Sequence, residues 1–322
     1  MNVRILLLAV VAASVGFSVH AQQQTSSWPE RSVNFVVPYA AGGPTDVAAR
    51  IVAEAIALRH RIIIENVTGA GTVVGTTRVA KSPKDGHVFL VATVAHAVND
   101  VLYTNLTFDA MKDFDSVALI GTVPQIVLVN KELPVTSLAE LIQLARSSPQ
   151  GLSYGSTGIG SAQHLAAELL KSMAEINAIH VPYRGSAPAV TDLIGGRLDF
   201  VIDSAATALQ HIKNGSVRAL AVTTQQRLPS LAQVPTVAES LPGYEAYTWN
   251  AILAPAGTEK KALLAMNAAI NAALEQPGTK SRLEELGITL ARSSTPESTK
   301  SFVESEVAKW QPLLKRAGVT PN

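Results

Sequence analysis

Apolar and polar positions along this chain follow two patterns, one typical of strands and one typical of helices, and segments with the two patterns alternate. Short apolar runs of strand length are followed by stretches in which apolar residues recur every three to four positions. The strand-like runs are residues 32–37, 61–65, 87–93, 116–120, 125–129, 151–154, 217–222 and 247–253, and a run that ends at Asp203. Helical spacing is found at residues 47–58, 138–146, 165–173, 260–274 and 296–314. Strands that alternate with helices predict an α/β fold with mostly parallel sheets and helices on both faces.

Polar or glycine-rich segments follow several of the predicted strands directly. In open α/β sheets, ligands bind outside the carboxyl ends of the strands. The segments in question are residues 40–46, 93–99, 155–164 and 183–187, together with Asp203. We therefore expect these segments to converge on one cleft.

Two of these segments are glycine turns between a strand and a helix, residues 38–46 (PYAAGGPTD) and 155–164 (GSTGIGSAQH). The first N–H groups of a helix have no partner within the helix, and the helix dipole is positive there, so such a turn can hold an anion. The alternative is an ordinary capped turn, with Ser161 as N-cap of the second helix and Thr45 or Asp46 capping the first. Two such turns in one chain favour a pair of anion-binding loops.

A third glycine segment, residues 69–75 (GAGTVVG), has a spacing that can mark dinucleotide binding when it lies between a strand and a helix. The helix predicted to follow it, residues 76–81, is very short, and nicotinamide enzymes are rarely exported. We interpret this segment as a tight turn that brings the backbone close to the cleft.

The N-terminal residues predict export. Arg4 precedes an apolar run at residues 5–19, and Val19 and Ala21 stand at the −3 and −1 positions of a secretory signal cleaved after Ala21. An uncleaved anchor is the alternative. Nothing later resembles a transmembrane span, and the chain has no cysteine for a disulfide or a lipid anchor. We expect a periplasmic protein.

The charge balance offers no support for binding nucleic acid or a membrane surface. The whole chain has 26 basic and 25 acidic residues. Residues 1–21 carry one arginine and no acid, so the chain that follows them has equal numbers of both. No large basic field is available to attract a polyanion.

No set of catalytic residues assembles from the sequence. A nucleophile elbow needs G-x-S-x-G, but Tyr154 stands two positions before Ser156, and the seven histidines show no metal-ligand spacing. The enzyme alternative is an exported hydrolase that uses Ser156 or Ser161 with His164 and Asp203. We prefer cap or ligand contacts for His164 and hydrogen bonding for Asp203, and expect no catalytic residue, metal or cofactor.

Several motifs together resemble one known family. They are residues 38–46, 155–165, 181–188 (VPYRGSAP), 192–196 (DLIGG), 234–239 (VPTVAE) and 249–258 (WNAILAPAGT). The chain resembles the Bug receptors, the periplasmic solute-binding components of tripartite tricarboxylate transporters, over essentially all of its length after the signal. The resemblance implies a two-domain Venus-flytrap fold of the type II periplasmic class, in which the chain crosses twice between domains.

The resemblance also implies domain boundaries and a site. We expect residues 22–125 plus 248–322 to form domain 1 and residues 126–247 to form domain 2, with the ligand cleft between them. In this family the ligand is usually a small carboxylate, held mainly by backbone groups and bridging waters of two facing loops. The expected ligand residues are Tyr39, Ala41, Gly42, Gly43, Thr45, Asp46 and Thr93 in domain 1, and Ser156, Thr157, Gly158, Gly160, Ser161, His164, Gly185, Ala187 and Asp203 in domain 2.

The family's partners follow from the same resemblance. The closed form would present a small organic acid to the membrane permease subunits of a tripartite tricarboxylate transporter, or to a sensor protein, and we expect a monomer. Three departures leave the ligand's identity open. The segment of residues 51–64 is about two residues shorter than is usual in the family. Residues 65–71 read ENVTGAG where the family commonly has ENRPGAG, and Val94 replaces a serine found in many members.

Overall fold

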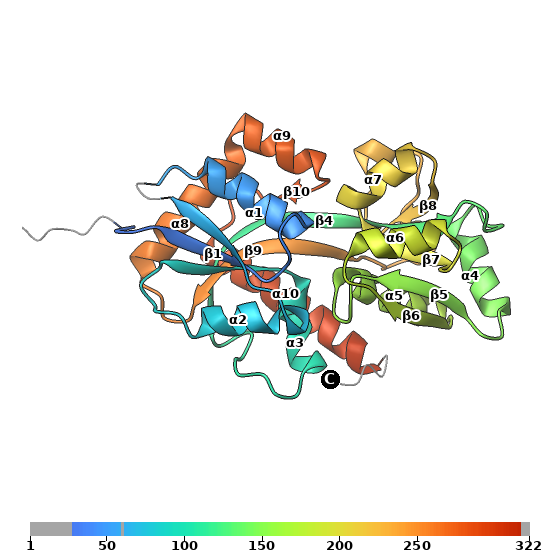
Figure 1. The fold of residues 1–322 in the computed structure, drawn as a ribbon, viewed down its shortest axis with the longest axis horizontal. Coiled ribbons are helices and arrows are strands. Elements are labelled where there is room, and N and C mark those ends of the chain that lie inside the picture. Colours follow the sequence, from blue (N-terminus) through green and yellow to red (C-terminus); the bar gives the residue numbers. More distant parts are fainter. Residues whose placement is uncertain (1–27, 59–60, 317–322) are drawn as a thin grey trace, which may run out of the picture.

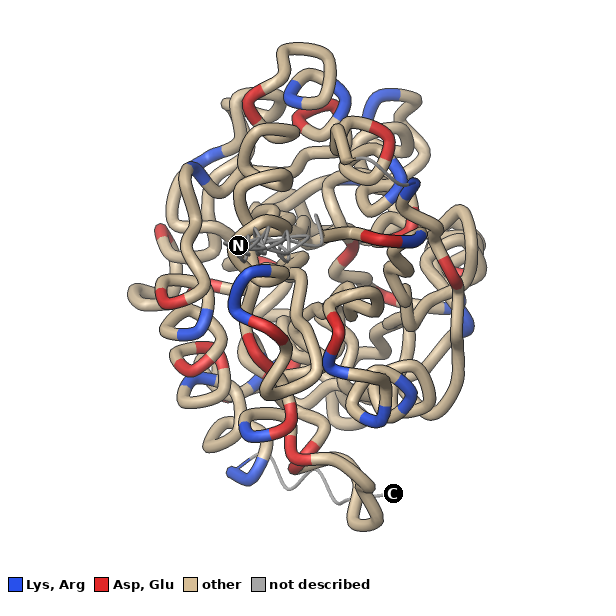
Figure 2. Tube along the Cα trace, turned by 90° about the vertical axis from the view of Figure 1, so that its left-hand side faces the viewer, with Lys and Arg blue, Asp and Glu red and all other residues tan. Residues whose placement is uncertain are grey.

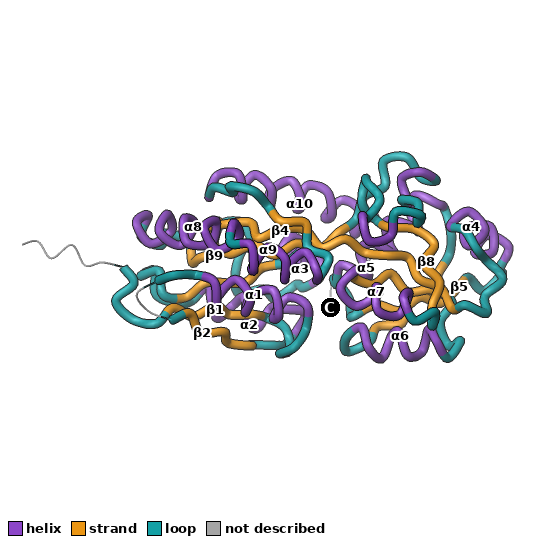
Figure 3. Tube along the Cα trace, turned by 90° about the horizontal axis from the view of Figure 1, so that it is seen from above, coloured by secondary structure: helices purple, strands orange, loops and turns teal. Residues whose placement is uncertain are grey.

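The computed structural model describes residues 28–58 and 61–316. The expected secretory signal, residues 1–21, lies outside the described residues. Two halves lie side by side along the long axis, and the strands β4 (Phe114–Asn130) and β9 (Tyr247–Pro255) connect them (Figure 1). Helix α10 (Pro296–Arg316) packs against β4 (Figure 3) and α3 (Val94–Leu102) and also contacts α5 (Ala162–Ala174) of the other half.

The first half is a sheet with helices on both faces. Its parallel strands are β1 (Val33–Val37), β2 (Ile62–Asn66) and β3 (Val88–Ala92), with β1 in the middle. Successive strand residues point to opposite faces, so Phe35 packs in one cluster with α1 (Pro44–Ala55), α8 (Lys260–Glu275) and α9 (Pro277–Glu285). Val36 packs on the other face with α2 (Val73–Ala80) and α3 (Val94–Leu102).

The second half repeats this plan. Its parallel strands are β5 (Leu152–Ser156), β6 (Ala178–Pro182) and β7 (Phe200–Ser204), with β5 in the middle. One face is covered by α4 (Leu138–Ser147) and α5 (Ala162–Ala174), and the other by α6 (Ser186–Ile194) and α7 (Ala205–Lys213). The predicted α/β class with helices on both faces is confirmed.

Every antiparallel pair among the described strands includes β4 or β9. These pairs are β3–β9, β9–β4, β4–β7, β4 with β8 (Val217–Val222) and β4 with β10 (Thr289–Leu290). β4 runs from the first half into the second. β3 is therefore parallel to β4 and β7 is antiparallel to it, so β1, β2 and β3 end towards the second half while β5, β6 and β7 end towards the first.

Several elements differ from the sequence prediction, among them β6, which lies outside the predicted strand runs. Residues 116–120 and 125–129 belong to one strand, because the segment between them stays paired with β9 up to Pro124 opposite Tyr247. Residues 94–102 form helix α3, which the polar residues His96 and Asn99 conceal in the sequence, although both are buried. Helix α9 stands between the two helices predicted for the C-terminal part.

The distribution of charged residues agrees with the balanced composition. Basic and acidic residues are interspersed over the trace rather than separated by sign (Figure 2). Within residues 28–58 and 61–316, no helix combines the length and the apolar character needed to cross a membrane.

Candidate functional site

The predicted ligand segments lie on the facing edges of the two halves, because each follows the carboxyl end of a parallel strand. Residues 39–46 follow β1 and Thr93 follows β3, while residues 157–164 follow β5, Gly185 follows β6 and Asp203 lies at the end of β7. The halves also touch near this edge, since a Cβ atom added to Gly160 would collide with the side chain of Leu102 in α3. We call residues 156–161 the clamp loop.

In the first half, Asp46 shapes its own loop rather than capping the helix. Its carboxylate is 1% exposed and accepts hydrogen bonds from the Gly42 N–H (2.8 Å), Arg50 Nε (2.9 Å) and Asn66 Nδ2 (2.8 Å). Burial alone would raise the pKa of Asp46, but the hydrogen bonds from Arg50, Gly42 and Asn66 hold that pKa below its usual value. Asp46 is therefore an ionised structural carboxylate.

The predicted cap by Thr45 or Asp46 is wrong. Helix α1 begins at Pro44 with Gly43 as N-cap, and no side chain caps it. The reason is that Asp46 already lies in the first turn and its carboxylate is engaged by Gly42 and Arg50. The N–H groups of Thr45 and Asp46 thus have no partner within the helix, and Ala41 and Gly42 beside them are exposed.

Tyr39 and Thr93 join the ends of β1 and β3. The Tyr39 hydroxyl lies 2.6 Å from Thr93 Oγ1, and the Thr93 side chain accepts from the Ala95 N–H as N-cap of α3. Burial raises the pKa of Tyr39 to about 12, against a smaller opposing effect of the Thr93 hydrogen bond, so the phenol stays protonated. Val94, which begins α3, is 1% exposed.

In the second half, the clamp loop is held by its own side chains. Ser161 accepts from the His164 N–H (3.3 Å), which confirms it as the N-cap of α5. The Gly158 N–H donates to Ser156 Oγ (3.0 Å) and the Gly160 N–H donates to His164 Nδ1 (3.2 Å). Gly158 and Gly160 have φ values of +124° and +76°, which favour glycine. The N–H groups of Ala162 and Gln163, in the first turn of α5, have no partner within the helix.

Below the clamp loop lies a pair of stacked histidines, of which the sequence predicted only His164. The ring of His180, in β6, stacks on His164 with centroids 4.3 Å apart, and its Nε2 lies 2.6 Å from Ser156 Oγ. Burial lowers the pKa of both rings, that of His180 to about 4 with a further contribution from His164. His180 lies opposite Tyr154 of β5, whereas the apolar Ile179 on the other face of β6 is exposed, so the alternation of β6 did not indicate His180.

Asp203 links the first turns of two helices. Its carboxylate accepts from Ser186 Oγ (2.7 Å) in α6, Thr207 Oγ1 (2.6 Å) in α7 and the Ser204 N–H (2.9 Å). Gly185 is the N-cap of α6, and Ala187 in its first turn is exposed. Ser186 and Thr207 were not predicted, because nothing in the sequence indicates which hydroxyls reach Asp203.

The alternative hydrolase set is not brought together by the described residues. Ser161 caps α5, His164 Nδ1 is occupied by the Gly160 N–H, and Asp203 is bonded within the α6–α7 corner. Ser156 instead contacts His180, whose other ring nitrogen bonds to no carboxylate among the described residues. The described part of the chain also contains no group of three or more histidine or acidic side chains that could hold a metal ion.

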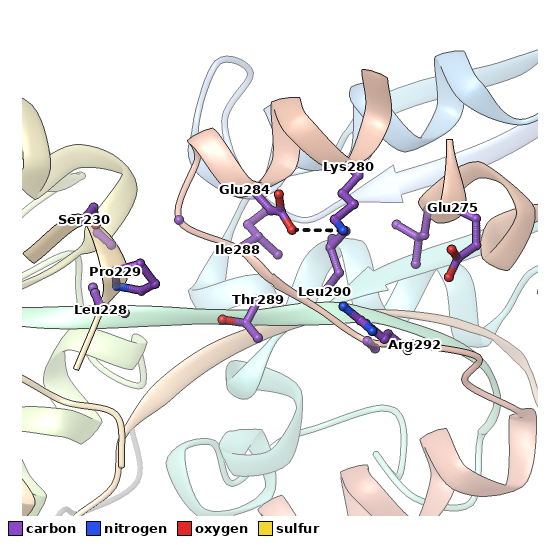
Figure 4. A pocket seen from close by; sticks show the side chains of 14 residues that line it. Leu228, Pro229, Ser230, Glu275, Lys280, Glu284, Ile288, Thr289, Leu290 and Arg292 are labelled. Carbon is purple, nitrogen blue, oxygen red and sulfur yellow. Dashed lines mark ion pairs between the residues drawn. The ribbon is translucent and has the colours of Figure 1, made fainter. Parts of the chain in front are cut away.

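A separate hollow of about 620 Å³ lies between the halves, on the side of α7 and α9 (Figure 4). Its lining from one half is Ala205 and residues 228–230, and its lining from the other is residues 274, 275, 280, 284 and 287–292. Its charged residues balance, since Glu275 and Glu284 accompany Lys280 and Arg292, and Lys280 pairs with Glu284 at 3.9 Å. None of the predicted ligand residues lines this hollow.

Comparison with known proteins agrees with this architecture. Residues 48–319 match the model of the tripartite tricarboxylate transporter family receptor. The structure of periplasmic binding protein BugD superposes with a TM-score of 0.82 at 34% identity, covering 92% of this chain and 100% of that one. Rpa4515 of R. palustris, with adipate, gives 0.84 at 37%, with coverage of 92% and 100%. MatC of Rhodopseudomonas palustris, with bound malate, gives 0.81 at 32%, with coverage of 89% and 100%. The two-domain periplasmic-binding-protein fold is confirmed.

Proposed function

Because the chain belongs to the receptor family of tripartite tricarboxylate transporters, we propose that it captures a small dicarboxylate between its two halves and delivers it to the permease of such a transporter. The protein is a periplasmic solute-binding protein of the Bug type.

One observation carries the proposal. The strand registers bring the uncapped start of α1 and the start of α5 to facing edges of the two halves. Each helix start offers N–H groups without a helical partner, and the positive N-terminal end of each helix dipole favours a negative group. Two such ends can hold the two carboxylates of one ligand without a buried cation. Adipate and malate, the ligands of two similar proteins, both carry two carboxylates.

We also propose how the chain is divided and processed. The signal would be cleaved after Ala21, and residues 22–125 plus 248–322 would move as one body against residues 126–247. The mature protein would act as a monomer that closes by a hinge where β4 and β9 pass between the halves, and ligand would stabilise the closed form.

The test is a thermal-unfolding panel of mono-, di- and tricarboxylates, aromatic acids and amino acids, with adipate and malate as first members. A ligand at about one hundred times its Kd adds about 2.7 kcal/mol to the free energy of unfolding, so a true ligand raises the Tm by several degrees. The matched control is dimethyl adipate, which keeps the chain length and lacks both charges. If no acid raises the Tm more than its ester, the proposed function is wrong.

The hydrolase alternative is tested on the same preparation with activated esters. We expect no turnover above that of a Ser156→Ala variant. Turnover that this substitution, or Ser161→Ala, abolishes would replace the binding role by an enzymatic one.

A further inference from the structure

We propose that His164 and His180 are positioning residues that hold the clamp loop in its binding shape, and that protonation of His164 breaks this arrangement and releases the bound acid. The proposal rests on the proposed function for its ligand, but the loop's behaviour can be measured without one.

One hydrogen-bond acceptor, His164 Nδ1, holds the Gly160 end of the clamp loop. The Gly160 N–H donates to His164 Nδ1 at 3.2 Å, and the His164 side chain is almost fully buried. An imidazole nitrogen accepts a hydrogen bond only while it carries no proton, and both nitrogens of a protonated ring are donors. A proton on Nδ1 would point at the Gly160 N–H. The loop bond therefore exists only with neutral His164, protonated on Nε2.

The other histidine of the stacked pair, His180, contacts the Ser156 end of the clamp loop. His180 Nε2 lies 2.6 Å from Ser156 Oγ, and that hydroxyl both accepts from the Gly158 N–H (3.0 Å) and contacts the Gly158 carbonyl oxygen (3.1 Å). Since the rings of His164 and His180 stack at 4.3 Å, a charge on one opposes a charge on the other. The two histidines together fix both glycines of the clamp loop.

The surrounding charges decide which ring takes the proton. On α5, Glu168 Oε1 lies 4.0 Å from His164 Nε2, and the same oxygen accepts from Tyr154 (2.7 Å) and Lys171 (2.6 Å). The Glu168 carboxylate favours a proton on His164, and Lys171 opposes it. His180 lacks so close a carboxylate, so His164 is the ring that switches first.

Among the described residues, the other packed elements add one ring and no further charged partner to the stack. On β5 the ring of Tyr154 stacks on His180 with centroids 4.9 Å apart. On β7 the ring of Phe200 stacks on Tyr154. The Tyr244 hydroxyl donates to the Ala166 carbonyl oxygen of α5. On α10, which packs on α5, the buried Glu306 accepts from Trp249, Trp310 and the Tyr247 hydroxyl. Burial lowers the pKa of both histidines, so the switch operates on the acid side of neutrality.

The first experiment needs no ligand. In nitrogen-15-labelled protein, the imidazole signals of His164 and the amide signal of Gly160 are followed by NMR from pH 7.5 to pH 4. We expect the Gly160 amide to shift with the His164 titration and to lose its slowed hydrogen exchange, while the amide of Gly215, outside the loop, follows neither. A Gly160 amide that ignores the titration of His164 would overturn the proposal.

The second experiment measures the Kd of adipate and malate at pH 7.0 and pH 4.5 in matched variants. His164→Asn places a non-titrating amide oxygen near the position of Nδ1, and His164→Leu removes the acceptor. His211→Gln, in α7, is the control. The quantity compared is the Kd at pH 4.5 divided by the Kd at pH 7.0. The ligand acid itself is protonated to the same extent in every variant, so only differences in this ratio between variants are interpreted.

We expect the wild type and His211→Gln to share one ratio, and His164→Asn to have a ratio about tenfold smaller, the effect of one hydrogen bond that no longer breaks in acid. His164→Leu should bind weakly at both pH values, and its unfolding transition shows whether it is folded. An unchanged ratio in His164→Asn would refute the switch. If neither acid binds any variant at pH 7.0, the ligand of the proposed function is sought in the wider panel of acids, and the NMR titration still decides this inference.

Discussion

At the scale of single residues, the sequence predicts most of the groups that line the facing edges but not how they are paired. Ser161 is the cap that its position indicates, because a serine before an apolar-periodic run has one common role. Asp46 is not a cap, because Arg50 one turn later and Asn66 from β2 compete for its carboxylate. Only the fold brings Asn66 there. His180 was missed for the same reason, since its partners Ser156 and His164 come from other elements.

Alanine substitutions at two glycines separate the effect of backbone strain from the effect of the contact between the halves at Gly160. Gly160→Ala and Gly215→Ala both place a side chain at positive φ, +76° and +69°, and we expect each to lose about 1–2 kcal/mol in the free energy of unfolding. Only the new methyl group at Gly160 meets Leu102 of the other half. Urea unfolding should therefore give similar losses, while calorimetry should show weaker ligand binding for Gly160→Ala alone. Equal affinities in the two variants would contradict a contact that forms on closure.

At the scale of elements, the sequence predicts those whose apolar pattern is clean. Helix α5 and strand β5 stand where their periodicity places them. Helix α3 was not seen because its buried polar residues find partners in distant segments, Ala110 for His96 and Thr72 for Asn99. A buried polar side chain is indistinguishable from an exposed one in a hydropathy pattern. The long strand β4 was divided because residues 121–124 contain a glycine and a proline, which in isolation indicate a break.

The start of α5 can be tested by removing one donor. Ala162→Pro deletes an N–H group at the first helical position, where proline is well tolerated, so the fold should lose little stability. We expect the affinity for the bound acid to fall about tenfold, as for one lost hydrogen bond to a charged group. The matched control is Lys260→Pro at the first position of α8, which starts after β9 and away from the facing edges. A Kd that is equal in the two variants would exclude the α5 end from the site.

At the scale of the whole molecule, family membership and the alternation of strands and helices were sufficient for the fold class. They were not sufficient to predict that the parallel strands of the two halves end towards each other, because this arrangement depends on how β4 and β9 pair with both halves. The hollow beside α7 and α9 also had no sequence signal, since its lining comes from segments far apart in the chain.

The buried histidines should make the whole molecule sensitive to mild acid. Burial lowers the pKa of His96 from 6.5 to about 4, and lowers that of His164 and His180 as well. Below pH 6.5 the unfolded chain takes up protons that the folded chain does not, so the free energy of unfolding falls as the pH falls. His96 alone contributes roughly 3 kcal/mol of this loss by pH 4, at about 1.4 kcal/mol per pKa unit.

Urea-unfolding midpoints between pH 7.5 and pH 4.5 measure this loss. Carboxylates with a lowered pKa, such as Asp46, also lose their stabilising effect in acid, but only near and below their unfolded pKa of about 4. A decline that begins near pH 6.5 is therefore due to histidine. A midpoint that stays constant down to pH 5 would contradict the prediction.

The pairing of Pro124 with Tyr247 has a consequence for how such receptors can diversify. The polypeptide leaves the first half and returns to it at neighbouring positions of two paired strands, so the intervening segment behaves like an inserted cassette with a single paired entry and exit. Recombination between relatives could exchange this cassette in one event and give one jaw a new specificity. The recipient would need to keep the two junctions, the surface that α10 presents to α5 and the contact of Leu102 with Gly160. A chimera joined at these positions should fold, whereas junctions placed inside β4 and away from β9 should not.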